Sequence, residues 1–147
     1  MESMESRMVK LYARNNNHVA LHAIPGHFAT SHSHINFYID MTSLKTRANE
    51  AQEVAKSLAG DYVNSTVVDT IVCMDGTEVV GAYLAQEFEK RGFRNTNLHN
   101  TIYVVTPEYN ANNQLIFRDN TIPAIKGKNV ILLLATTTTG LTVRRSL

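Results

Sequence analysis

The sequence predicts an α/β fold with a mostly parallel central sheet and helices on both of its faces. Residues 66–74 and 130–134 are β-branched and apolar, as expected of strands that are buried on both sides. Residues 44–58 and 78–90 have the composition and spacing of helices, and they alternate with these strands. Such alternation is typical of a parallel sheet. A chain of 147 residues can form one domain with a substantial core, but not two.

The N-terminal region is predicted to begin with a short amphipathic helix over residues 1–14. Its apolar residues share one helical face: Met1, Met4, Met8 and Leu11. Residues 15–34 are rich in Asn, His and Ser and contain the turn signal Pro25-Gly26. Residues 36–41 are expected to form a short strand.

The helix over 44–58 is the most clearly patterned element of the chain. Its apolar positions recur at helical spacing: Leu44, Ala48, Ala51, Ala55 and Leu58. Gly60 is placed to end it. The strand over 66–74 follows and is broken by Asp75-Gly76-Thr77, after which a second helix extends from 78 to 90 and ends near Gly92.

The C-terminal third continues the alternation. A strand is expected over 101–105, a polar loop over 107–113, a short strand over 115–117 and a turn over 123–128. Residues 130–134 form the most apolar strand of the chain, and we expect it to be the most buried one. A loop over 136–140 and a helix that begins at 141 follow. Parallel folds usually return such a helix to another strand, so the C-terminal part of the fold is expected to be missing.

Composition limits the classes of protein. The formal net charge of +1 argues against a nucleic-acid binder, which would usually carry a basic stripe. The single cysteine, Cys73, allows no internal disulfide and fits the reducing cytoplasm. The first residues lack the pattern of a signal peptide. No apolar run approaches the roughly 18 residues that span a membrane, so no membrane association is expected.

The segment that follows the strand over 130–134 is a candidate phosphate site. It joins a hydroxyl-rich loop to a predicted helix N-terminus, where free backbone N–H groups, the helix dipole and threonine hydroxyls suit a phosphate dianion. The candidate residues are Thr136, Thr137, Thr138, Thr139, Gly140, Leu141 and Thr142. A threonine-capped helix after a core strand would have the same pattern, and the two interpretations are about equally favoured.

A second candidate loop consists of Asp75, Gly76, Thr77 and Glu78. Ligands of open α/β sheets bind in crevices outside the carboxyl ends of the strands, and this loop follows such an end. The two carboxylates could coordinate Mg²⁺ beside a pyrophosphate. Alternatively, Asp75-Gly76 makes a turn, Thr77 caps the helix and the carboxylates interact with its dipole. Taken by itself, the loop fits this structural interpretation better.

Two motifs together resemble the type I phosphoribosyltransferases, most closely the orotate enzymes. Thr138-Thr139-Gly140-Leu141-Thr142 matches the end of the family's last motif, and Asn36-Phe37-Tyr38-Ile39-Asp40 resembles the Tyr-Tyr-Ile-Asp stretch of the orotate enzymes. The resemblance covers roughly residues 20–147. It implies a single domain, 1–147, in which an N-terminal helix and hood region, 1–43, precede an α/β core, 44–147.

The resemblance also implies a function. Phosphoribosyl pyrophosphate would bind with its 5′-phosphate on residues 136–142 and its pyrophosphate near residues 75–78, with Mg²⁺ and without an organic cofactor. A nucleobase would then displace pyrophosphate from the ribose. Such enzymes are expected to be cytoplasmic homodimers of nucleotide metabolism, here of pyrimidine biosynthesis, whose partner is a small phosphoribosyl or nucleotide ligand.

The sequence departs from the family at the residues that support turnover. Leu134 and Ala135 replace the acidic pair that contacts the ribose hydroxyls. Residues 106–114, which correspond to the family's mobile basic loop, contain no lysine or arginine, and Arg118 is the nearest. The alternative function is therefore a non-catalytic regulatory protein that binds phosphoribosyl pyrophosphate or a nucleotide. Catalytic residues and the identity of the base cannot be read from the sequence.

Two other features carry weaker predictions. Histidines are dense near the N-terminus, at positions 18, 22, 27, 32 and 34, but no cysteine or carboxylate clusters with them, so no metal site is expected. Cys73 lies at a strand end and is expected to be a buried small apolar residue, not a nucleophile.

Overall fold

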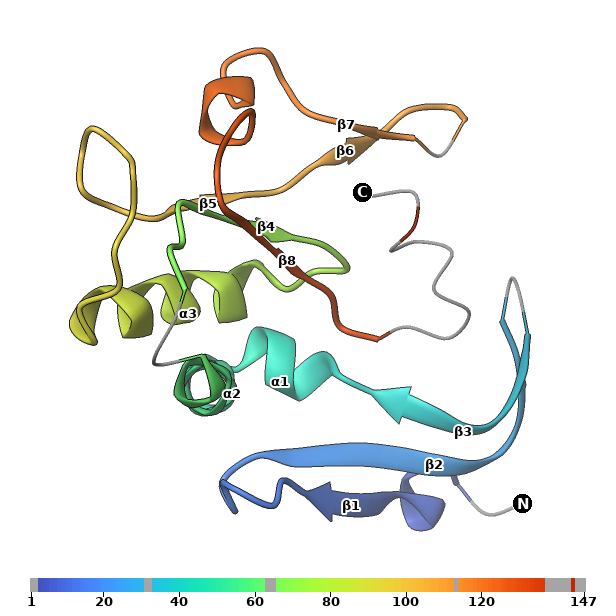
Figure 1. Ribbon diagram of the computed structural model, residues 1–147. Coiled ribbons are helices and arrows are strands. Elements are labelled where there is room, and N and C mark those ends of the chain that lie inside the picture. Colours follow the sequence, from blue (N-terminus) through green and yellow to red (C-terminus); the bar gives the residue numbers. More distant parts are fainter. Residues whose placement is uncertain (1–2, 31–32, 63–65, 113, 137–143, 145–147) are drawn as a thin grey trace.

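The computed structural model describes residues 3–30, 33–62, 66–112, 114–136 and 144 (Figure 1). Its elements in chain order are η1 (Glu5–Arg7), β1 (Val9–Tyr12), β2 (Ala20–Ala29), β3 (His34–Asp40), α1 (Thr42–Thr46), α2 (Ala48–Asp61), β4 (Thr70–Cys73), α3 (Glu78–Lys90), β5 (Tyr103–Val105), β6 (Glu108–Tyr109), β7 (Leu115–Ile116), η2 (Ile122–Ala124) and β8 (Val130–Leu133). The predicted α/β class is confirmed. The described helices include none long and apolar enough to cross a membrane.

A small parallel sheet forms the centre of the molecule, in the strand order β5-β4-β8. Ile71 of β4 pairs with Val104 of β5 on one side and with Ile131 of β8 on the other, and both pairings are parallel. All four residues of β4 are buried, because strands flank both of its edges and side chains cover both of its faces. The predicted strands over 66–74, 101–105 and 130–134 are confirmed in shorter form.

The two long helices pack on the same face of this sheet (Figure 1). The core cluster that joins them to the strands contains Ala55, Ala59, Val68, Ile71, Cys73, Leu84, Ala85, Phe88 and Ile102. The expectation of helices on both faces is therefore wrong for the described residues. The segment around η2 covers part of the opposite face, where the hydroxyl of Thr70 donates to the carbonyl of Ala124.

The helices themselves agree with the sequence prediction. α3 occupies the predicted range 78–90, and it packs extensively against α2. The single helix predicted over 44–58 is divided into α1 and α2 at Arg47, whose extended backbone (φ −85°, ψ 118°) interrupts the helical path. Gly60 does not end α2, which continues to Asp61.

The N-terminal region differs most from the prediction. The amphipathic helix over 1–14 is wrong: one short turn, η1, is followed by strand β1, which pairs antiparallel with β2. Residues 15–34 contain β2, a ten-residue strand that was not predicted from the sequence. Pro25-Gly26 lies at a shift in the β2–β3 register between Pro25 and Phe28, and such a bulge accommodates proline within a strand. A short helix gains little stability in isolation, so pairing with a long neighbouring strand prevails.

Two further expectations are corrected. Residues 107–113 were predicted to be a polar loop, but β6 lies there and pairs antiparallel with β7. The strand over 130–134 was expected to be the most buried, yet β8 is the outer strand of the described sheet and all of its residues are partly or largely exposed. Apolar composition predicts burial on average, but it does not reveal which strand lies at the edge of a sheet. Of the predicted C-terminal helix, only Arg144 is described.

A buried carboxylate at the start of β4 connects three segments. Asp69 is fully buried, and its two oxygens accept hydrogen bonds from the backbone and side chains of Thr96 and Asn129. Burial alone would raise the pKa of Asp69, but hydrogen bonds from the backbone N–H groups and side chains of these two residues outweigh it and lower the pKa to about 2. The ionised side chain thus attaches β4 to the segments that precede β5 and β8.

The pKa of Asp69 predicts acid sensitivity of the fold. Because the folded pKa lies below the ordinary value of 3.8, the carboxylate contributes stability that is present above about pH 4 and lost as the pH falls toward 2. The contribution is about 2 kcal/mol. Urea unfolding from pH 6 to pH 2 should show this loss. For Asp69→Asn, the free energy of unfolding should be lower at pH 6 and should change less as the pH falls from 4 to 2. Equal pH profiles of the two proteins would contradict the assignment.

α3 approaches β4 closely at a glycine. A Cβ atom at Gly81 would lie 2.2 Å from the Sγ atom of Cys73 and 3.4 Å from a methyl group of Val104. Because Cys73 is fully buried in the packed core, its side chain cannot move aside cheaply. The hydrogen side chain of Gly81 therefore sets the distance between helix and sheet. A Cβ atom at Gly60 on α2, by contrast, would have no atom of the described residues within 4 Å.

Two alanine substitutions should separate packing from helix propensity. Gly81→Ala should lower the free energy of unfolding by about 1–3 kcal/mol, since the new methyl group overpacks the core. Gly60→Ala has open space around it and should raise stability by about 0.5–1 kcal/mol. Chemical denaturation of both variants measures the difference. A stabilised Gly81→Ala variant would show that α3 does not lie against β4 as described.

Candidate functional site

The carboxyl ends of β4 and β8 lie side by side. Cys73 pairs with Leu133, and the backbone N–H of Met74 donates to the carbonyl of Leu133 at 2.9 Å. The loop over residues 75–78 therefore leaves the sheet at the same edge as the segment that begins at Ala135. Of the residues in the threonine-rich candidate site, Thr136 is described and exposed, whereas Thr137 to Thr142 lie outside the described residues.

The loop between β4 and α3 has a left-handed turn at its tip. Asp75 and Gly76 have φ angles of 56° and 74°, and both are exposed. Asp tolerates this conformation better than most residues, and glycine adopts it freely. The turn therefore confirms the part of the prediction in which Asp75-Gly76 breaks the strand and reverses the chain toward α3.

Thr77 acts differently from the predicted helix cap. Its buried hydroxyl donates back to the strand, at 2.7 Å to the carbonyl of Met74, and it also approaches the carbonyl of Leu133 at 3.3 Å. Thr77 thereby links the ends of both strands. Within the part of the chain that the structure describes, no side chain caps the start of α3. The N–H of Thr77 donates to the carbonyl of Met74 at 3.2 Å and that of Gly81 to the carbonyl of Thr77 at 2.8 Å, whereas the N–H groups of residues 78–80 have no acceptor among the described residues.

A lysine that the sequence did not single out reaches this loop. Lys45 of α1 donates from Nζ to the carbonyl oxygen of Asp75 at 2.9 Å, and Nζ lies 3.7 Å from where a Cβ of Gly76 would be. An ammonium group has three donors, so this contact leaves others for a ligand. Nothing in the local sequence distinguishes Lys45 from a solvated helix lysine, because its role depends on contact over a separation of 30 residues.

The end of β3 contributes charge next to this lysine. The side chain of Asp40 accepts a hydrogen bond from the backbone N–H of Thr42 at 2.9 Å. Hydrogen bonds from the Thr42 side chain and backbone lower the pKa of Asp40, with smaller contributions from the charges of His22 and Lys45. The segment over residues 36–40 thus ends close to the lysine that contacts the β4–α3 loop.

The β6–β7 hairpin lies near the same loop. The hydroxyl of Thr106 contacts Glu78 Oε1 at 3.4 Å. The pKa of Tyr109 is raised, first by burial and then by the negative charge of Asp75. Arg118, the nearest basic residue to this hairpin, is already paired, since its Nε donates to Glu108 at 2.7 Å. The hydroxyl of Thr106 and the phenol of Tyr109 therefore lie toward residues 75–78. The described residues of this segment include no cation without a partner.

The residues Leu134 and Ala135 follow β8 directly. Leu134 and Ala135 are half-buried, and neither can accept a hydrogen bond through its side chain. Cys73, on the neighbouring strand, is fully buried as predicted. Burial, and secondarily the charge of Glu78, raises the pKa of its thiol to about 11, so it is not a thiolate nucleophile near neutral pH.

The N-terminal histidines do not form a metal centre among the described residues, where no group of three or more suitable ligands is found. His27 and His34 do meet across the β2–β3 pair, with Nε2 and Nδ1 at 2.9 Å. His18 lies before β2, whereas His22 lies opposite Asp40 within the sheet. His32 lies outside the described residues.

These groups together suit an anion at the edge of the sheet. An ammonium group, the uncapped first turn of a helix and an exposed glycine turn can each approach phosphate oxygens. Asp75 and Glu78 oppose an anion by themselves, but carboxylates in this position can hold Mg²⁺ between protein and phosphate. The arrangement is therefore chemically suited to a metal-bound polyphosphate more than to a bare anion.

Comparison of the chain with protein-family models, with curated proteins and with solved structures gives no significant match.

Proposed function

We propose that this protein is a phosphoribosyltransferase-like protein of the orotate type, which binds phosphoribosyl pyrophosphate at the carboxyl ends of β4 and β8. The observation that carries the proposal is the parallel pairing of Cys73 with Leu133. Because of this pairing, the two loops that the sequence motifs associate with pyrophosphate and with 5′-phosphate begin at one edge of one sheet. Two phosphate groups of a single small ligand could thus be held by two neighbouring loops.

In this proposal the pyrophosphate group lies against residues 75–78 and Lys45. Lys45 supplies positive charge, and the N–H groups at the start of α3 supply hydrogen-bond donors. Asp75 and Glu78 are both exposed, so they are free to bind Mg²⁺ that arrives with the pyrophosphate. The 5′-phosphate is assigned to residues 136–142 on the basis of the sequence motif.

A second candidate function is binding without turnover, and specific residues favour it. The side chains of Leu134 and Ala135 cannot accept hydrogen bonds from ribose hydroxyls, nor can they stabilise positive charge on the sugar ring. The described residues of the hairpin bring no free cation to the leaving group, since Arg118 pairs with Glu108. A departing pyrophosphate needs charge neutralisation. A regulatory protein that senses phosphoribosyl pyrophosphate or a nucleotide would need only the binding elements.

Replacing Lys45 tests the binding proposal. We expect isothermal titration calorimetry to show Mg²⁺-dependent binding of phosphoribosyl pyrophosphate, and Lys45→Gln to weaken it roughly ten-fold through loss of a charge-assisted contact. Lys56→Gln is the matched control, because Lys56 pairs with Glu53 on α2 and does not contact the loop. If a folded sample binds neither phosphoribosyl pyrophosphate nor any nucleoside monophosphate, the proposed function is wrong.

Turnover separates the enzyme from the binding protein. Loss of a charge-assisted contact to the ribose costs on the order of 1.5–3 kcal/mol, or roughly ten- to a hundred-fold in rate if the contact acts in the transition state. We therefore expect slow release of pyrophosphate with orotate, and a faster rate for Ala135→Asp, which restores one carboxylate. Rapid turnover by the unmodified chain would show that the acidic pair is dispensable here.

A further inference from the structure

We propose that the protein binds one transition-metal ion, with a preference for Cu²⁺, between two histidines of the N-terminal sheet. His27 of β2 and His34 of β3 are both exposed, and His27 Nε2 lies 2.9 Å from His34 Nδ1. Their ring centroids are 4.9 Å apart, so the rings meet through these nitrogens and do not stack. Neutral imidazole nitrogen is the commonest metal ligand in proteins.

The pairing of β2 with β3 brings the two rings together. The strands are antiparallel, and their register shifts between Pro25 and Phe28. Beyond the shift, Ala29 lies opposite His34. His27 precedes Ala29 by two residues and is therefore diagonal to His34, at a separation that long side chains bridge. Because the contact depends on strand pairing, the spacing of the histidines along the sequence does not reveal it.

Hydrogen bonds at the turn hold the strands in this register. The N–H of Thr30 donates to the carbonyl of Ser33 at 2.7 Å, and the N–H of Ser33 donates to Oγ1 of Thr30 at 2.9 Å. The pair formed by Ala29 and His34 lies directly beside these contacts. The backbone positions that carry the two histidines are thus fixed before a metal arrives, and binding has less conformational entropy to overcome.

The distance between the two nitrogens suits neighbouring corners of a square. With metal–nitrogen bonds of about 2.0 Å, two nitrogens at a right angle lie about 2.8 Å apart, whereas two at a tetrahedral angle lie about 3.3 Å apart. The separation of 2.9 Å in the structure is closer to the first value. Square-planar or tetragonal coordination is typical of Cu²⁺ and Ni²⁺, and of these Cu²⁺ binds nitrogen ligands more tightly.

Both facing nitrogens can present a lone pair to the metal. In the hydrogen-bonded pair, one ring nitrogen donates its N–H and the other accepts. A change of the donor ring to its other tautomer moves that proton to the distal nitrogen, and both facing nitrogens then carry lone pairs without any change in net protonation. Neither ring has a further hydrogen-bond partner among the described residues, so the change breaks no other contact.

The site is open, because the protein supplies only part of the coordination. The described residues contain no group of three or more side chains suited to a metal, so the pair provides two ligands and water completes the shell. Mg²⁺ prefers carboxylate, carbonyl and water oxygens, whereas imidazole suits Cu²⁺, Ni²⁺ and Zn²⁺. The histidine pair and the carboxylates of residues 75–78 therefore select different ions, and the two proposals can fail independently.

Cu²⁺ alone is the probe for this site. The full chain, without a polyhistidine tag, is titrated with Cu²⁺ near neutral pH by calorimetry, and the bound ion is examined by electron paramagnetic resonance. We expect the most tightly bound Cu²⁺ to be tetragonal and coupled to two imidazole nitrogens. An excess of Mg²⁺ should not displace it. Coupling to fewer than two nitrogens, or displacement by Mg²⁺, would overturn the proposal.

Histidine variants separate the pair from single exposed histidines. His27→Gln and His34→Gln should each weaken Cu²⁺ binding at least roughly ten-fold, since loss of a group that merely orients a metal ligand already costs about that much. The double variant should bind little more weakly than either single variant, because one remaining histidine no longer chelates.

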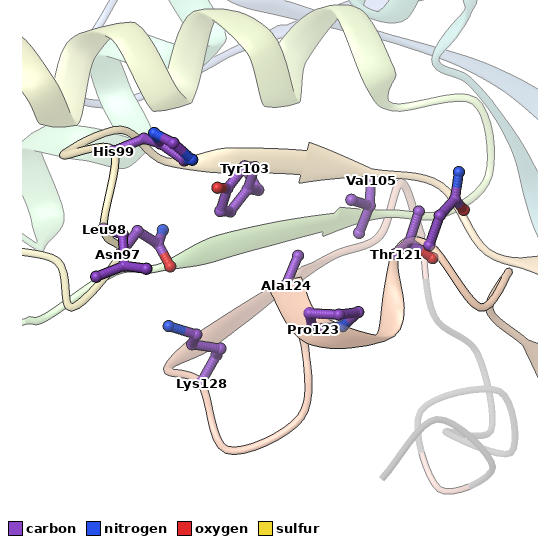
Figure 2. Close-up of a pocket in the computed structure, with 10 residues that line it drawn as sticks. Asn97, Leu98, His99, Tyr103, Val105, Thr121, Pro123, Ala124 and Lys128 are labelled. Carbon is purple, nitrogen blue, oxygen red and sulfur yellow. The ribbon is translucent and has the colours of Figure 1, made fainter.

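His99→Gln is the matched control. His99 is also exposed, and the described residues that line the cavity beside it include no second histidine (Figure 2). This variant should retain the affinity of the unmodified chain. Circular dichroism melts verify that all variants are folded. Unchanged affinity in His27→Gln, or an equal loss in His99→Gln, would show that Cu²⁺ binds elsewhere on the surface.

Discussion

The arrangement of the parallel sheet depends on one buried carboxylate. Asp69 receives hydrogen bonds from two segments that are far apart in the chain, one before β5 and one before β8. Its backbone carbonyl also accepts from Asn97 and from the N–H of Tyr103. A buried charge is tolerated only when it is well paired, and here all of its partners are neutral donors. One side chain thereby aligns the amino ends of three strands, and this alignment determines which loops meet at their carboxyl ends.

The sequence predicts the core better than the N-terminal region, and the physical reason is local. α3 and β4 are specified by patterns within their own residues, namely helical apolar spacing and a continuous β-branched run. β1 and β2 are not specified by such local patterns, because β1 forms by pairing with β2, and β2 also pairs with β3. The spacing of the methionines in residues 1–14 imitates a helix, yet Val9, Leu11 and Tyr12 are equally suited to a strand, and the neighbouring strand decides between them.

The candidate site was predictable only in part. The turn at Asp75-Gly76 and the burial of Cys73 follow from residue types, and both are confirmed. Lys45 and Tyr109 could not be found in the same way, because their positions depend on how α1 and the β6–β7 hairpin fold back onto the loop. The assignment of residues 136–142 to phosphate stays a prediction, since all but Thr136 lie outside the described residues.

Because Gly81 of α3 lies against Cys73 of β4, the thiol of Cys73 can also report the separation of this helix from the sheet. Cys73 is the single cysteine of the chain, it is fully buried, and its thiol is held in the neutral form. A thiol reagent can therefore react only after α3 separates from β4 or the domain unfolds. When reclosing is fast, the rate of labelling reports the free energy of that opening. A ligand that binds at the start of α3 would slow the labelling, so the labelling rate of Cys73 would measure such binding without an added fluorophore.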